Sequence, residues 1–398
     1  MRYFITAVLV FYSLFLNAQK TSTTFTTDKK TLQIPDPLTK TSSGIANYII
    51  TNFLSQKERS GAIFIWITNN ISYDIENAFA INFYASSNQI IEEVLRTRKG
   101  VCMHYAELFS DIAVKCGLKS FVVNGYTKQN GFVDYIPHAW CAVMIDSVWS
   151  LIDPTWGSGY VRNARFVSQV NDYYFMTKPE LLIKSHMPFD PLWQFLNYPV
   201  TNQEFYEGNF TIKKNKPYFD YNDTLQKFIN QADIERLVSS TRRIEQNGVR
   251  NSMIFDRLQH NKREIEYYIK KQETDRLNES VTIFNEAVNL YNEGINRLNE
   301  FIRFRNNQFN PKKSDSEIRQ MLQEPETILN TVRKELNQIK YTDSNVATSI
   351  LQLNKSIDEA EINLNEQKVF LNKYFNTSKV LRKSLFYKYT WMGNPARK

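Results

Sequence analysis

The spacing of apolar residues divides the chain into a front part with helices and strands and a rear part with helices alone. Apolar residues recur every three or four positions, as in helices, over residues 45–70, 89–97 and 101–116. Short runs of strand-forming residues follow, with a turn at Asp146-Ser147, over residues 120–127, 138–145 and 147–153. A helix followed by antiparallel strands predicts an α+β domain.

The rear part carries two apolar seams with alternating steps of four and three residues, the spacing of heptad repeats. The first seam consists of Leu277, Val281, Phe284, Val288, Tyr291, Ile295, Leu298 and Ile302, and the second of Val346, Ile350, Leu353, Ile357, Ala360 and Leu364. Two such seams predict an antiparallel helical bundle or a coiled-coil hairpin. We expect the seams to bury each other within the chain, and association with a second copy or a partner is the open alternative.

The first residues predict export. Arg2 precedes a fourteen-residue apolar run, and the small Ala18 stands before a polar segment; these features describe a secretory signal peptide. The run is shorter than the roughly 20 residues of a membrane-spanning helix, so an uncleaved anchor is the less favoured alternative. We expect a periplasmic, cell-envelope or secreted protein with no stable membrane span after cleavage.

The expected domain organisation follows from these changes in pattern. It comprises a signal peptide over residues 1–18, a flexible segment over 19–44, an α+β domain over 45–215 and a helical or coiled-coil domain over 216–398. A hydrophobic content of 42% is enough for a folded core. The net charge of +8 comes from basic residues that are mixed with acidic ones, so we expect a solvated surface and no nucleic-acid partner.

Cysteine usage leaves one thiol free. The chain has only Cys102, Cys116 and Cys141, too few for a disulfide framework. If Cys102 and Cys116 share a helix, they lie about 21 Å apart and cannot be bonded. A disulfide between Cys116 and Cys141 stays open, and Cys102 is then the free cysteine at the first turn of a helix.

The strand hairpin brings a histidine and an aspartate together. With a two-residue turn, Ile145 pairs with Val148, and His138 and Asp153 then share one face of the sheet as diagonal neighbours. A carboxylate so placed orients an imidazole, which can take a proton from a nucleophile. Cys102 is the candidate nucleophile, because a helix N-terminus stabilises a thiolate. Gly100 would let a substrate approach the backbone closely.

Several motifs give the front part a resemblance to the transglutaminase-like superfamily with its papain-like Cys-His-Asp architecture. They are RKGVCMHYAELF around Cys102, GYTK over residues 125–128, and HAWCAVMIDSVWSLIDPTWG around His138 and Asp153. The stretches IFIWITNNISYD and YYFMTKPELLIKSHMPFDPLWQFL make the chain most similar to the kyphoscoliosis peptidase and cytokinesis-protein branch. Together the motifs cover roughly residues 45–206.

The resemblance implies a fold and a set of catalytic roles. It implies a Cys-bearing helix packed on an antiparallel sheet, with Cys102 as nucleophile, His138 as general base and acid, and Asp153 as its orienter. For Trp66 it implies an indole N–H contact to the oxyanion, although the amphipathic helical pattern around Trp66 favours a core tryptophan. The residue after HAW is usually Asn in this family and is Cys141 here. In the strand register Cys141 faces away from His138.

The expected function is that of a cysteine peptidase or amidase acting on a peptide or protein substrate, with protein cross-linking as a less favoured version. A catalytically silent binding or scaffold protein with a helical interaction region is the alternative. A zinc site formed by Cys102, His104, His138 and Cys141 is a third hypothesis with an unusual ligand spacing. We expect no metal and no cofactor.

Overall fold

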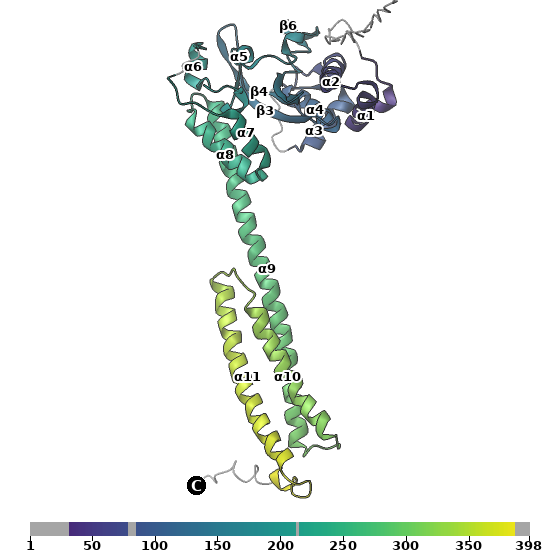
Figure 1. The fold of residues 1–398 in the computed structure, drawn as a ribbon, viewed down its shortest axis with the longest axis vertical. Helices are drawn as coiled ribbons and strands as arrows, with labels where there is room; N and C mark the ends of the chain where they lie inside the picture. The colour runs from purple at the N-terminus through teal and green to yellow at the C-terminus, as the bar shows by residue number, and fades with distance from the viewer. Residues whose placement is uncertain (1–31, 79–84, 212–214, 387–398) are drawn as a thin grey trace, which may run out of the picture. The chain divides into compact units, whose positions relative to one another are not determined.

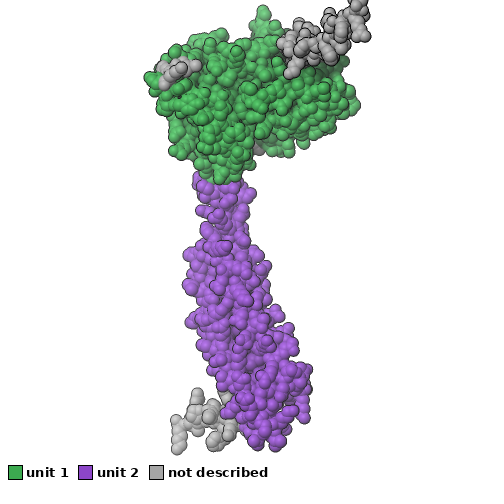
Figure 2. Space-filling view, viewed as in Figure 1, with its two compact units in different colours: residues 1–265 green, residues 266–398 purple. Residues whose placement is uncertain are grey.

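The computed structural model describes residues 32–78, 85–211 and 215–386 (Figure 1). The chain divides into two compact units, residues 1–265 and 266–398 (Figure 2). The expected signal peptide lies outside the described residues, and the expected domain boundary after residue 215 stays a prediction. Within the described ranges, none of the helices combines the length and the apolar character needed to cross a membrane.

The first unit contains α-helices, short 3₁₀ helices and strands. The helices are η1 (Asp36–Lys40), α1 (Ser42–Asn52), α2 (Gln56–Asn70), α3 (Ser87–Thr97), α4 (Cys102–Lys115), η2 (Asp172–Tyr174), α5 (Pro179–Leu182), η3 (Pro191–Gln194), α6 (Asn202–Glu207), α7 (Tyr221–Asn230) and α8 (Asp233–Gln246). The strands are β1 (Ser72–Tyr73), β2 (Lys99–Gly100), β3 (Lys119–Gln129), β4 (Phe132–Ile145), β5 (Val148–Ile152), β6 (Gly159–Arg162), β7 (Arg165–Ser168) and β8 (His186–Pro188).

The largest sheet is antiparallel and has the strand order β5-β4-β3-β8. Ile145 pairs with Val148 and Cys141 pairs with Ile152, which is the register predicted from a two-residue turn. Asp146 and Ser147 both adopt positive φ angles, as the tight turns of β-hairpins require. The predicted α+β class is confirmed, and the register decides which side chains of β4 face the helices.

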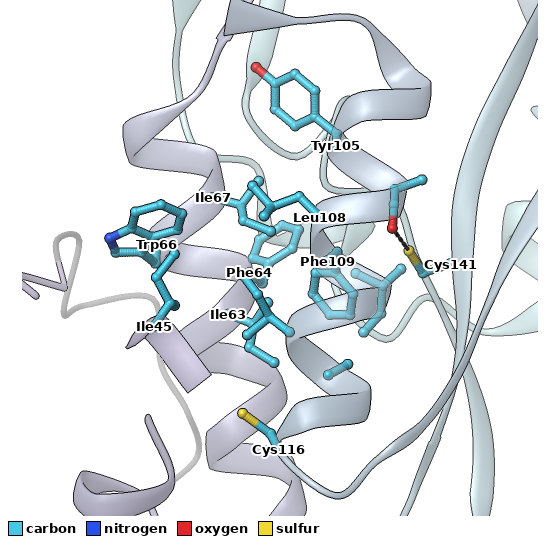
Figure 3. Close-up of a cluster of buried hydrophobic side chains, with 14 of the residues drawn as sticks. Ile45, Ile63, Phe64, Trp66, Ile67, Tyr105, Leu108, Phe109, Cys116 and Cys141 are labelled. Atoms are coloured by element: carbon cyan, nitrogen blue, oxygen red, sulfur yellow. Dashed lines mark hydrogen bonds between the residues drawn. The ribbon is translucent and has the colours of Figure 1, made fainter. Parts of the chain in front are cut away.

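The two faces of β4 enter different hydrophobic clusters, because side chains alternate along a strand. Ala139, Cys141 and Val143 pack in the cluster that contains the buried side of α4. Trp140 and Ala142 pack in a second cluster with residues of η3 and α7. Figure 3 shows the first cluster, where side chains of α2 and α4 interdigitate beside Cys141. Both faces of the sheet are therefore covered, and His138 lies on the same face as Trp140.

The helices α9 (Ser252–Asn306), α10 (Asp315–Leu336) and α11 (Ser344–Asn376) follow. The division between the two units falls within α9. The two predicted seams lie on α9 and α11, and α10 between them was not among the expected elements. Apolar residues of the three helices share one buried cluster, which includes Ala287, Val332, Leu336, Leu353 and Ile357. The seams thus pack within the chain, and association with a partner stays a prediction.

Candidate active site

Cys102 is the first residue of α4, where the sequence pattern predicted it. The preceding N-cap residue is Val101, whose side chain cannot cap the helix, although Ser, Thr, Asp and Asn are preferred at that position. The N-cap side chain therefore makes no hydrogen bond at the positive end of the helix dipole, where the cysteine lies. Cys102 is 7% exposed, and its thiol donates to the carbonyl oxygen of Pro137 at 3.8 Å.

Gly100 leaves room for a neighbouring side chain. A Cβ added there would lie 2.5 Å from the Cβ of His104, so the absent side chain makes room for that histidine. Nδ1 of His104 accepts a hydrogen bond from the backbone N–H of Val101 at 3.3 Å. Burial lowers the pKa of His104, which keeps its ring neutral and able to accept. Gly100 and His104 thus shape the backbone just before the cysteine.

Asp153 follows the last residue of β5 and is completely buried. Its Oδ1 accepts hydrogen bonds from the backbone N–H groups of Thr155 at 2.8 Å and Trp156 at 3.1 Å. This local turn holds the carboxylate in one orientation. The second oxygen, Oδ2, is left to face the strands, where it lies 2.8 Å from Nε2 of His138. The contact predicted from the hairpin register is present.

The His138 ring is held between Asp153 and Cys102. Burial alone would lower the pKa of His138, but the Asp153 carboxylate outweighs burial and raises this pKa to about 10, with a further contribution from Cys102. Burial would raise the pKa of Asp153, and the two neighbouring histidines hold it well below its usual range. Because Nε2 of His138 faces the carboxylate, Nδ1 is the nitrogen left for the Cys102 thiol.

A second histidine, His186 of β8, contacts the same carboxylate oxygen. Its Nε2 lies 3.0 Å from Asp153 Oδ2, and its side chain is fully buried. The sequence reasoning did not assign His186 a role. The available signal was its place in the short stretch SHMPF, as one of only four histidines in the chain.

Aromatic rings surround the two histidines. Trp156 lies 4.5 Å from His186 and 5.7 Å from His138 between ring centroids, and Trp140 lies 5.2 Å and 6.1 Å from the same two rings. These rings keep water from the carboxylate, which strengthens its interaction with the imidazoles. On the open side, a pocket of about 670 Å³ is lined by His138, Trp156 and other residues that include Tyr73, Thr155, Tyr160 and Tyr174.

Trp66 does not share this pocket. It is 1% exposed in the core cluster of the first unit, and the Arg98 guanidinium lies 5.1 Å from its ring centroid. Figure 3 shows Trp66 on the side of α2 that points away from Cys141 and α4. The structure thus places Trp66 in the core, the alternative to the oxyanion role that the resemblance implied.

The disulfide between Cys116 and Cys141, which the sequence left open, is absent. All three cysteines are free and buried. The thiol of Cys141 donates to the carbonyl oxygen of Ala106 at 3.3 Å, and that of Cys116 donates to Ala46 at 3.8 Å. Cys141 therefore packs against α4 on the sheet face opposite His138, as the strand register predicted.

The four side chains of the hypothetical zinc site do not come together. Cys141 donates to the carbonyl oxygen of Ala106, and His104 accepts from the backbone N–H of Val101. Among the described residues, the one group of three or more His, Cys, Asp or Glu side chains whose ligand atoms all lie within 4.8 Å of one another consists of His138, Asp153 and His186. In this cluster both ring nitrogens stand at hydrogen-bonding distance from one carboxylate oxygen. We therefore interpret it as a hydrogen-bonded network.

A thiol at a helix N-terminus, an imidazole and a buried carboxylate that orients it define the class of papain-like cysteine sites. Residues 43–154 match the family model of the transglutaminase-like superfamily, so this part of the chain is a transglutaminase-like domain.

Two curated proteins and one solved structure are similar to part of this chain. The mouse kyphoscoliosis peptidase is 37% identical over 159 residues, which are 38% of this chain and 24% of that protein. Cytokinesis protein 3 of Schizosaccharomyces pombe is 28% identical over 156 residues, 38% of this chain and 17% of that protein. A crystal structure of a TGase covers 34% of this chain and 37% of its own at 22% identity, with a TM-score of 0.25. The curated relatives support the predicted branch, and the match spans about a quarter of the mouse protein.

Proposed function

We propose that the chain is a thiol-dependent acyl-transfer enzyme, a cysteine peptidase or amidase that acts on a peptide or protein substrate. Cys102 is the nucleophile, His138 the general base and acid, and Asp153 its orienter. The observation that carries the proposal is the buried contact of 2.8 Å between His138 and Asp153 beside the helix start that bears Cys102.

The proposed reaction moves one proton back and forth. Nδ1 of His138 takes the thiol proton of Cys102, and the thiolate attacks the carbonyl carbon of the scissile bond. The imidazolium, paired with Asp153, then gives that proton to the leaving amine, which leaves a thioester on Cys102. His138 next takes a proton from water, the resulting hydroxide attacks the thioester, and the proton returns to the Cys102 sulfur.

The start of α4 supplies the proposed oxyanion site. Its N-cap residue, Val101, contributes no capping side chain, so backbone N–H groups of the first turn can donate to a negatively charged oxygen next to Sγ. A poor N-cap residue breaks a local preference, and such breaks are expected at functional sites. The pocket beside His138 is the proposed position of the substrate.

Alkylation by iodoacetamide tests the nucleophile. In the folded protein we expect Cys102 to react at least about a hundredfold faster than Cys116 or Cys141. Burial raises the pKa of Cys116 to about 11 and that of Cys141 well above its usual value, so both serve as internal controls. Replacing His138 with alanine should lower the alkylation rate of Cys102 by about a hundredfold, because the thiol then lacks the base that takes its proton. Mass spectrometry of each cysteine peptide measures the rates.

Equal, slow labelling of all three cysteines would contradict the proposal and favour a silent binding or scaffold protein. Incubating an unfolded protein substrate with and without a fluorescent primary amine separates the reaction types. New peptide termini indicate hydrolysis, whereas amine incorporation into the substrate indicates transamidation.

We also propose that the protein is exported, on the basis of the apolar segment after Arg2. Expression of the full chain in a bacterial host with a general secretion pathway should yield a mature N-terminus at Gln19 in the non-cytoplasmic fraction. Retention of Met1 in the cytoplasm would contradict this proposal.

A further inference from the structure

His186 joins the site from the edge strand of the sheet, 33 residues after Asp153. The whole residue is 1% exposed. Strand β8 is held against β3 by the pairs Gly125 with Pro188, Tyr126 with Met187 and Thr127 with His186. This pairing fixes the position of the His186 backbone relative to β3, the neighbour of β4, which carries His138.

The proton positions on His186 follow from its neighbours. Burial lowers its pKa, although Asp153 opposes this effect, so the ring is neutral. A neutral ring that contacts a carboxylate oxygen must carry its hydrogen on Nε2 and donate it. Nδ1 then accepts from the Ser185 hydroxyl, which lies 2.8 Å away. The Ser185 hydroxyl also lies 3.3 Å from the carbonyl oxygen of Leu182, and donation to the nearer Nδ1 is compatible with the tautomer that Asp153 requires.

The Asp153 carboxylate accepts four hydrogen bonds in this arrangement. Two come from the backbone N–H groups of Thr155 and Trp156 to Oδ1, and two come from the rings of His138 and His186 to Oδ2. A carboxylate offers about four acceptor positions, so its capacity is filled. Without His186 a fully buried carboxylate would lack one donor, and an anion that is short of donors in a dry site binds a proton more readily.

We propose that His186 is a positioning residue that keeps Asp153 ionised and aimed at His138, so that the site is a four-residue Cys-His-Asp-His arrangement. This inference rests on the proposed function, because it assigns His186 a task in the same reaction. His186 acts through Asp153 and does not touch the reacting atoms.

Several titratable groups around this site interact electrostatically with its members. Those that interact with Asp153 are His138, His186, Cys141, Tyr73, Tyr105 and Tyr174. Asp134 acts on His186, and Cys102 acts on His138. Burial raises the pKa values of the tyrosines and of Cys141, so these groups stay neutral at neutral pH. The coupled protons of His138 and Asp153 therefore govern how the reactivity of the site falls at low pH.

The test follows the alkylation rate of Cys102 against pH in the full chain and its variants. The acid-limb midpoint is the pH at which the alkylation rate has fallen to half on the acid side. His186→Leu removes a donor to Asp153, whose carboxylate then binds a proton more readily. The midpoint should therefore rise by about one pH unit, the shift expected from losing one hydrogen bond to a charged group. His186→Gln places an amide N–H near the position of Nε2 and should restore the wild-type midpoint. Ser185→Ala should raise the midpoint by a smaller amount. If the leucine variant does not fold, this variant is used to test the inference.

A purely structural role for His186 would lower the melting temperature and leave the midpoint unchanged, and this result would overturn the inference. Reactivity that chelators abolish and zinc restores would also overturn it, since the cluster would then be a metal site. Nitrogen-15 NMR of the histidine rings separates the two proposals. The spectra could show a neutral His186 with its hydrogen on Nε2 while Cys102 of the wild type is unreactive. This result would contradict the proposed function but support the contact of His186 with Asp153.

Discussion

Replacing Asp153 with asparagine is expected to lower peptide or amide turnover by about 10³- to 10⁴-fold. The asparagine oxygen would accept the backbone N–H groups that now bind Oδ1. Its amide hydrogens would then point at Nε2 of His138, which must accept and must therefore carry its own proton on Nδ1. In that tautomer the ring cannot take the proton of Cys102. Turnover of a peptide substrate and the alkylation rate of Cys102 measure the effect.

The same substitution should change stability in a pH-dependent way. A carboxyl group with a lowered pKa contributes stability that is present above its unfolded pKa of about 3.9 and is lost as the pH falls through its folded value. The folded pKa of Asp153 is lowered, because the two histidines outweigh burial. Asp153→Asn should therefore cost about 3–5 kcal/mol near neutral pH, as the loss of one member of a buried pair does, and less below about pH 4.

Urea unfolding at pH 7 and pH 3 measures this difference. Asp146→Asn is the matched control, since Asp146 is exposed in the turn between β4 and β5 and asparagine tolerates its positive φ angle. The control should differ little from the wild type at either pH. A deficit of equal size at both pH values for Asp153→Asn would contradict the assigned ionisation.

Replacing Gly125 with alanine is expected to destabilise the first unit by more than about 3 kcal/mol, beyond the usual range for overpacking. A Cβ there would lie 2.1 Å from the carbonyl oxygen of Met187 and 2.7 Å from Cα of Pro188, both backbone atoms of β8. Backbone atoms cannot rotate out of the way as the end of a flexible side chain can. Strand β8 must therefore move away from β3. Because β8 carries His186, the shift also separates this ring from Asp153.

Chemical unfolding and the acid limb of Cys102 alkylation together measure the consequence of Gly125→Ala. Gly131→Ala provides the control on the same hairpin, because its Cβ would meet no atom within 4 Å but its φ of 85° is unfavourable for alanine. The control should cost about 1 kcal/mol and leave the alkylation profile unchanged. Similar losses for the two variants would show that the close approach of β8 does not matter.

Local signals in the sequence were enough to predict much of the site. Gly100 and Gly117 bracket the helix that starts at Cys102, and the two-residue turn at Asp146-Ser147 defines the register of the hairpin. Because side chains alternate along a strand, that register also predicts the contact of His138 with Asp153 and the opposite direction of Cys141. These features depend on residues that are near in sequence, where geometry follows from spacing alone.

Features that depend on distant segments were missed or misassigned. The clearance that Gly100 gives to the side chain of His104 was not predicted, because spacing alone does not show how that ring packs. The pairing of Cys116 with Cys141 stayed open, since spacing alone does not reveal that each thiol donates to a different helix carbonyl. Helix α10 contributes to neither predicted seam, although its apolar residues share a buried cluster with residues of the two helices that carry the seams.

The sequence by itself determined the class of the domain, the helix that presents Cys102 and the hairpin that joins His138 to Asp153. Only the tertiary structure decided which further groups surround that pair. His186 reaches Asp153 because β8 pairs with β3 at the sheet edge, and Trp66 lies in the core because α2 turns it away from the sheet. The physical reason is that such contacts depend on the packing of segments far apart in the chain, which the spacing of residues does not encode.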